Sequence, residues 1–66
     1  MKNFLKEERL KKQLTQIQLA ELVGVSRQTI FSIEINKYVP SVLLSLKLAR
    51  ALGKKVEAVF QLEVSD

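Results

Sequence analysis

The chain has 66 residues, of which 47% are hydrophobic, and a formal net charge of +4. It contains neither Cys nor His, which excludes disulfides, zinc fingers and imidazole catalysis. The length allows one domain, residues 1–66, with a small core, and no apolar run approaches the roughly 20 residues of a membrane span. The first residues lack the pattern of a secretion signal. We therefore expect a cytoplasmic protein with no cofactor, no metal and no membrane contact.

The charge is distributed unevenly along the chain. Residues 1–12 and 35–55 carry net charges of +3 and +5, whereas residues 13–34 and 56–66 carry −1 and −3. One interpretation is ordinary solvated surface charge. The other is a cationic flank on each side of a central segment, with an acidic tail kept away from a polyanionic partner such as DNA.

The first helix is predicted over about residues 4–12. Its apolar residues Phe4, Leu5 and Leu10 are sparse. Leu14 follows in the turn.

Residues 15–34 indicate two short helices, about 16–23 and 27–34, joined by a tight turn at Gly24. The hydroxyls of Thr15 and Ser26 are suited to cap these helices, and Gly24 suits a left-handed helix end. The residues expected to face inward are Leu19, Ala20, Val25, Ile30 and Ile33. The residues expected to face outward are Arg27, Gln28, Phe31 and Ser32. A short helix that presents Arg and Gln at its N-terminal end can reach base edges in a major groove.

A loop over residues 35–40 ends at Pro40, and Ser41 is placed to cap a helix over about 42–52. Gly53 stops this helix. Its broad apolar face consists of Val42, Leu44, Leu46, Leu48, Ala49 and Leu52. A short helix over about 55–60 follows, with Val56, Val59 and Phe60 expected to face inward.

The tail then changes period. Phe60, Leu62 and Val64 alternate with polar residues, which is the spacing of a β-strand. An isolated strand is not stable, so it needs a partner. The candidates are the extended residues 1–3 of the same chain and the tail of a second chain.

Several groups of residues stand in order and without gaps along nearly the whole chain. They are Leu-Thr-Gln at 14–16, Leu-Ala-Glu-Leu-Val-Gly-Val-Ser-Arg-Gln-Thr-Ile at 19–30, Ile-Glu at 33–34, Lys-Tyr at 37–38, Pro-Ser at 40–41, Leu-Lys-Leu-Ala-Arg-Ala-Leu-Gly at 46–53 and Val-Glu-Ala-Val-Phe at 56–60. Together they resemble the phage repressor and Cro-like helix-turn-helix family, also called the xenobiotic-response-element class. The resemblance implies an all-α, compact five-helix, lambda-repressor-like DNA-binding domain with its motif at 15–34, to which the short C-terminal β-strand is added.

The resemblance assigns DNA contacts to the motif and to the loop after it. Gln28 is suited to adenine, and Arg27 to guanine or a phosphate. Gln16 is expected to touch a phosphate and to brace the recognition helix. Phe31 has two open roles, packing at the edge of the core or contact with thymine methyl groups. The complete set of expected DNA-contact residues is Gln16, Ser26, Arg27, Gln28, Thr29, Phe31, Ser32, Asn36, Lys37 and Tyr38. Tyr38 is equally open to packing at the core edge, and Thr29 to local packing.

Arg9 and Glu34 match a pair that forms a structural salt bridge in relatives. At Glu8, relatives carry an apolar residue, so we expect Glu8 to point outward from a slightly rotated helix. At Gln13, relatives carry Gly, so Gln13 needs either another helix ending or a strained positive φ. Ile35 stands where relatives carry Asn and removes one polar contact, while Asn36 still suits a left-handed turn.

From these residues we expect a homodimeric transcriptional repressor. The helix over 27–34 enters the major groove of an inverted-repeat operator in double-stranded DNA, and the protein is associated with the nucleoid. A dimerisation segment is expected at about 56–64, and the helix over 42–52 is a further candidate for the interface. Its expected interface residues are Val56, Val59, Phe60, Leu62 and Val64.

The alternative is a protein-interaction module, or an antitoxin-type protein, on the same fold. It is supported by apolar residues at positions that relatives usually make polar, namely Ile17, Ile35, Val39 and Leu43. Scattered exposure of such residues is also ordinary. An enzyme is not expected, because the acidic residues form no recognisable pair with a nucleophile.

Overall fold

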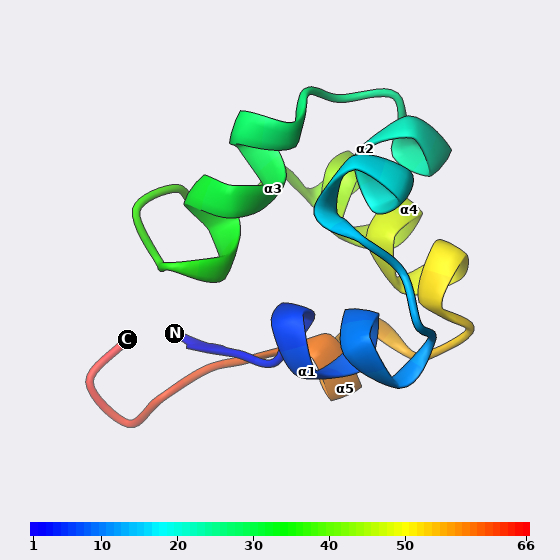
Figure 1. Ribbon diagram of the computed structural model, residues 1–66. Helices are drawn as coiled ribbons and strands as arrows, with labels where there is room; N and C mark the ends of the chain where they lie inside the picture. Colours follow the sequence, from blue (N-terminus) through cyan, green and yellow to red (C-terminus); the bar gives the residue numbers. More distant parts are fainter.

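Five helices and a two-stranded ribbon make up the computed structural model, which describes residues 1–66 (Figure 1). The elements, in chain order, are β1 (Lys2–Asn3), α1 (Leu5–Lys11), α2 (Gln16–Val23), α3 (Arg27–Glu34), α4 (Val42–Leu52), α5 (Val56–Val59) and β2 (Phe60–Gln61). The predicted all-α fold with five helices and a short terminal strand is confirmed. None of the helices has the length and apolar composition of a membrane span.

Three helices begin at side-chain caps that the sequence predicts. Thr15 accepts a hydrogen bond from the backbone N–H of Gln18 at 3.0 Å, and the Gln18 side chain accepts from the N–H of Thr15, which completes a capping box. Ser26 and Ser41 cap α3 and α4 in the same way, at 3.2 and 3.1 Å. These caps satisfy N–H groups that have no partner within the helix.

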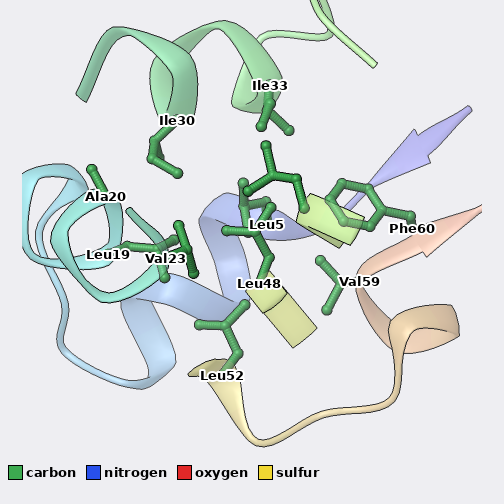
Figure 2. Close-up of a cluster of buried hydrophobic side chains, with 11 residues drawn as sticks. Leu5, Leu19, Ala20, Val23, Ile30, Ile33, Leu48, Leu52, Val59 and Phe60 are labelled. Carbon is green, nitrogen blue, oxygen red and sulfur yellow. The ribbon is translucent and has the colours of Figure 1, made fainter. Parts of the chain in front are cut away.

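The core lies where the helices meet (Figure 2). Ile30 and Ile33 point from α3 toward Leu5 of α1 and Leu19 of α2, and all four side chains are fully buried. The small Ala20 is also buried, which lets α2 and α3 approach closely. This packing fixes which face of α3 remains outside.

The terminal ribbon, formed by β1 and β2, shows which of the two candidate partners the tail pairs with. β1 and β2 are antiparallel, with Lys2 opposite Gln61 and Asn3 opposite Phe60, and the Phe4 N–H donates to the Val59 carbonyl at 2.8 Å. The tail therefore pairs with the start of the same chain.

The two chain ends lie side by side (Figure 1). The amino group of Met1 is 3.3 Å from a carboxylate oxygen of Glu63 and 3.1 Å from one of Asp66. The backbone N–H of Glu63, and then the Met1 amino group, lower the pKa of the Asp66 carboxyl. The hydrogen bond to Asp66 raises the pKa of the Met1 amino group. These exposed contacts add to the ribbon pairing only modestly.

Three expectations about packing are wrong. Glu8 is buried rather than outward, because its carboxylate lies 3.3 Å from the Lys11 amino group and 3.9 Å from that of Lys54. Val42 and Leu46 of α4 are exposed, because only the Leu44, Leu48 and Leu52 face of that helix meets the core.

Two of the expected interface residues lie in the core of the single chain. The side chains of Val59 and Phe60 are 0% and 9% exposed, because they complete the core of their own chain. They therefore have no free surface for a second chain. The predicted strand also ends earlier than its alternation suggests, at Gln61, and leaves Leu62 and Val64 exposed.

Gln13 ends α1 in a left-handed conformation, with φ of 58°. Its N–H donates to the Leu10 carbonyl at 2.9 Å, and the Leu14 N–H donates to the Arg9 carbonyl at 3.1 Å. This pair of hydrogen bonds is a Schellman motif, which usually places Gly at this position.

Replacement of this residue by glycine, Gln13→Gly, is expected to stabilise the chain by roughly 0.5–1 kcal/mol, because relief of left-handed strain exceeds the added entropy of the unfolded state. The melting temperature should rise by a few degrees, on the order of 4–8 °C per kcal/mol. Thermal unfolding followed by circular dichroism measures it. The control Lys6→Gly, at an exposed position in the first turn of α1, should lower stability by up to about 1 kcal/mol. A loss of stability in Gln13→Gly would contradict the strain argument.

Candidate nucleic-acid interface

The outer face of α3 is the first part of the candidate site. Because Ile30 and Ile33 face the core, Arg27, Gln28 and Phe31 are exposed on the other side of the helix. The Ser26 hydroxyl, besides capping α3, lies 3.0 Å from the hydroxyl of Thr29. The N-terminal end of α3 is therefore held locally, while the side chains of Arg27 and Gln28 remain exposed.

The loop after α3 folds back beside this face. The Lys37 N–H donates to the Ser32 carbonyl at 2.9 Å, and the Asn36 N–H donates to the Ile33 carbonyl at 3.0 Å. Asn36 itself has φ of 61°, so it forms the left-handed turn expected of it. This second Schellman motif fixes where the loop leaves the helix.

Five residues of the predicted set come together around one shallow hollow of about 260 Å³. They are Gln28, Thr29, Ser32, Lys37 and Tyr38. Within the hollow, the Gln28 amide donates to the Ser32 hydroxyl at 3.4 Å. Four of its five lining residues have polar side chains, and Lys37 carries a positive charge. Such an arrangement offers hydrogen-bond donors and acceptors to a polar, anionic surface.

A buried ion pair holds the opposite end of α3. The Arg9 Nε atom lies 2.7 Å from Glu34 Oε2, and the two side chains are 8% and 3% exposed. Arg9 also donates to the Leu14 carbonyl at 2.8 Å, and the Gln16 amide donates to Glu34 Oε1 at 3.1 Å. Glu34 thus receives donors from both α1 and α2. Gln16 braces α3, as expected, and its amide keeps a second N–H for another acceptor.

The surface formed by the outer face of α3 and the loop after it is positively charged. Arg27 and Lys37 are exposed cations, whereas the carboxylate of Glu34 is neutralised by Arg9. No group of acidic side chains is arranged to hold a metal ion.

Asn3 makes a contact with α3 that the sequence did not predict. Its side-chain amide donates to the carbonyl of Ile33. The only local signal is an Asn two residues before a helix start, where its side chain caps the N–H of Leu5 at 2.9 Å. Nothing local indicates a partner 30 residues away.

The fold and this exposed, cationic helix face define a helix-turn-helix DNA-binding protein. The family model for helix-turn-helix proteins matches residues 5–59. The chain belongs to this helix-turn-helix family.

Known proteins agree with this assignment. YgzD, an uncharacterised HTH-type transcriptional regulator of Bacillus subtilis, is 51% identical over 63 residues, 96% of each chain. Another from Methanocaldococcus jannaschii is 52% identical over 60 residues, 91% of each chain. The crystal structure of the restriction-modification controller protein C.AhdI from Aeromonas hydrophila matches with a TM-score of 0.80 at 36% identity, covering 85% of each chain. This chain is a DNA-binding transcriptional regulator and not an enzyme.

The substitution Arg9→Met is expected to lower the free energy of unfolding by about 3–5 kcal/mol, because it leaves the Glu34 carboxylate buried without its cation. The double variant Arg9→Met with Glu34→Leu should recover most of that loss, because it removes both charges of the pair. Urea denaturation of the three proteins measures both effects. A double variant as unstable as the single one would contradict this explanation.

Proposed function

We propose that the chain is a homodimeric repressor that binds an inverted-repeat operator, with α3 of each copy in the major groove. Two copies related by a two-fold axis would read half-sites about 34 Å apart, one turn of B-DNA. The observation that carries this proposal is the hollow beside α3, where polar residues of the helix and of the following loop share one exposed surface.

Base recognition is assigned to the exposed side of α3. Gln28 would pair with adenine and Arg27 with guanine or a neighbouring phosphate. Ser32, within hydrogen-bond reach of Gln28, would read the next base or orient the Gln28 amide. The Phe31 side chain is 38% exposed, which favours contact with thymine methyl groups over packing at the core edge.

Phosphate contacts are assigned to the rim of this surface. Lys37 and the Tyr38 hydroxyl border the hollow and would hold the backbone on one side. Gln16 would hold it through its second amide N–H. The remaining backbone contacts are assigned to Ser26, Thr29 and Asn36. Such contacts position a protein on DNA without reading its sequence.

Dimerisation is supported by apolar residues that the chain leaves uncovered. Leu62 is 82% exposed and Val64 is fully exposed, and Val56 at the start of α5 is half-buried. Val42 and Leu43, at the start of α4, are exposed as well. A domain this small gains stability by covering such surface with a second copy. The interface proposed here is thus the tail after β2 with the first turns of α4 and α5.

Repression would follow from occupancy of a promoter. The name of the similar C.AhdI structure, a restriction-modification controller protein, supports a regulatory role of this kind. A protein bound to chromosomal operators would reside in the cytoplasm with the nucleoid.

Partner binding is the second candidate function, and one observation favours it. Ile17, Ile35, Val39 and Leu43 are all exposed apolar residues. An antitoxin-type protein would use such a surface for another protein. Arg27 and Gln28, both exposed on the outer face of α3, favour the DNA-binding function.

The double variant Arg27→Ala with Gln28→Ala is expected to lose sequence-specific binding. Two base contacts of this kind contribute a combined loss of roughly 30-fold or more in affinity for the selected duplex. Fluorescence anisotropy with a selected duplex and a scrambled duplex measures it.

The matched control is Lys47→Ala with Gln61→Ala, which removes one cation and one amide from exposed positions outside the proposed site. It should keep the preference for the selected duplex. Unchanged specific binding in the Arg27 and Gln28 variant would refute the assignment of the reading surface.

The double variant Leu62→Ser with Val64→Ser is expected to weaken self-association, because these side chains would lie in the interface and not in the core. Sedimentation equilibrium should show at least about a tenfold higher dimer dissociation constant, from the loss of two buried apolar side chains. Leu10→Ser, on an exposed part of α1, is the control. A wild-type chain that stays monomeric at high concentration would rule out the homodimer.

A further inference from the structure

The side chain of Asn3 joins three elements. Its Nδ2 atom donates to the carbonyl of Ile33 in α3, and its Oδ1 atom accepts from the N–H of Leu5 at the start of α1 at 2.9 Å. Its backbone is paired with Phe60 in the terminal ribbon. One half-buried amide therefore connects the ribbon, α1 and the last turn of α3.

The point of attachment is at the C-terminal end of α3. Carbonyl groups in the last turn of a helix have no partner within the helix. The Ile33 carbonyl accepts from the Asn36 N–H at 3.0 Å in the turn after α3, and its second lone pair is available to the Asn3 amide. Arg9 and Gln16 hold the side chain of Glu34, and Asn3 holds the backbone of Ile33 next to it. Two consecutive residues are thus held from different directions, which restrains both the position and the rotation of the helix end.

The terminal ribbon has no other polar side-chain link to α3. The ribbon itself continues from the core residue Val59, whose carbonyl accepts from Phe4 at 2.8 Å. Asn3 is therefore the polar link between the C-terminal segment, where the proposed dimer interface lies, and α3.

We propose that Asn3 is a positioning residue for sequence-specific DNA recognition, which fixes α3 relative to the terminal ribbon through the Ile33 carbonyl. This inference rests on the proposed function, in which α3 reads base edges. Base-edge contacts need side chains held to within about 0.5 Å, whereas phosphate contacts by long cations position the protein without reading the sequence. Loss of the tether should therefore reduce specific affinity much more than non-specific affinity.

Two variants separate the tether from the cap that Asn3 provides to α1. Asn3→Ser keeps a neutral oxygen that can accept from the Leu5 N–H, but it removes the amide N–H that donates to Ile33 and leaves only a hydroxyl on a shorter side chain. Asn3→Ala removes both. Gln61→Ala is the matched control, because Gln61 is an exposed ribbon residue whose side chain makes no hydrogen bond to α3.

The test compares affinities for a duplex selected by the wild-type chain and for a scrambled duplex, with melting temperatures measured in parallel. Asn3→Ser is expected to lower affinity for the selected duplex about five- to tenfold, the effect of one lost hydrogen bond. Affinity for the scrambled duplex should change by less than about twofold, and Gln61→Ala should match the wild type. Asn3→Ala should bind like Asn3→Ser but melt at a lower temperature.

Three results would overturn the inference. The first is an Asn3→Ser variant that binds both duplexes as the wild type does. The second is an equal loss for the two duplexes that follows the melting temperature, which would give Asn3 a structural role only. The third is a wild-type chain that selects no duplex, in which case the proposed function itself fails and the recognition role of Asn3 fails with it.

Amide hydrogen exchange gives a readout that does not depend on DNA. In Asn3→Ser the amides of Asn36 and Lys37, at the end of α3, should exchange faster, while those of α2 stay as in the wild type. Unchanged exchange at the end of α3 would show that the tether does not restrain the helix.

Discussion

The buried ion pair between Arg9 and Glu34 is the interaction on which the arrangement of the reading surface depends. Its two side chains are almost inaccessible to water, so each charge needs the other. Glu34 also receives Gln16, and Arg9 also reaches the Leu14 carbonyl. One carboxylate therefore sets α1, α2 and α3 relative to one another, and the exposed face of α3 follows from that geometry.

Apolar packing and polar contacts together position α3. Ile30 and Ile33 turn one face of the helix into the core, which determines that Arg27 and Gln28 face outward. The Ser26 cap fixes where α3 begins, and the Asn36 turn returns Lys37 to its side. The result is a cationic, hydrogen-bonding surface on a rigid support, which is what recognition of a groove requires.

Local signals in the sequence predicted the helices well, because caps and helix-ending residues act on their own neighbours. Thr15, Ser26 and Ser41 begin α2, α3 and α4 at the expected positions. Tertiary packing decided the rest. Glu8 is buried beside Lys11 of its own helix and Lys54 of the loop after α4. Val59 faces inward as its spacing predicts, and the ribbon that follows it leaves it no role on the outer surface. The contact between Asn3 and Ile33 joins residues far apart in the chain, so no local pattern could indicate it.

In the candidate site, the motif predicted the position of the reading helix, but the hollow that joins α3 to Lys37 and Tyr38 became visible only in the structure.

Selection of binding sites from a randomised duplex pool tests the central claim most directly, because it asks whether this surface reads sequence. It should be done at about 0.15 M salt, where purely electrostatic binding is weakened. We expect enrichment of an inverted repeat with half-sites about one helical turn apart. No enrichment, with binding that disappears as the salt concentration rises, would contradict sequence-specific recognition by α3 and would favour a protein partner instead.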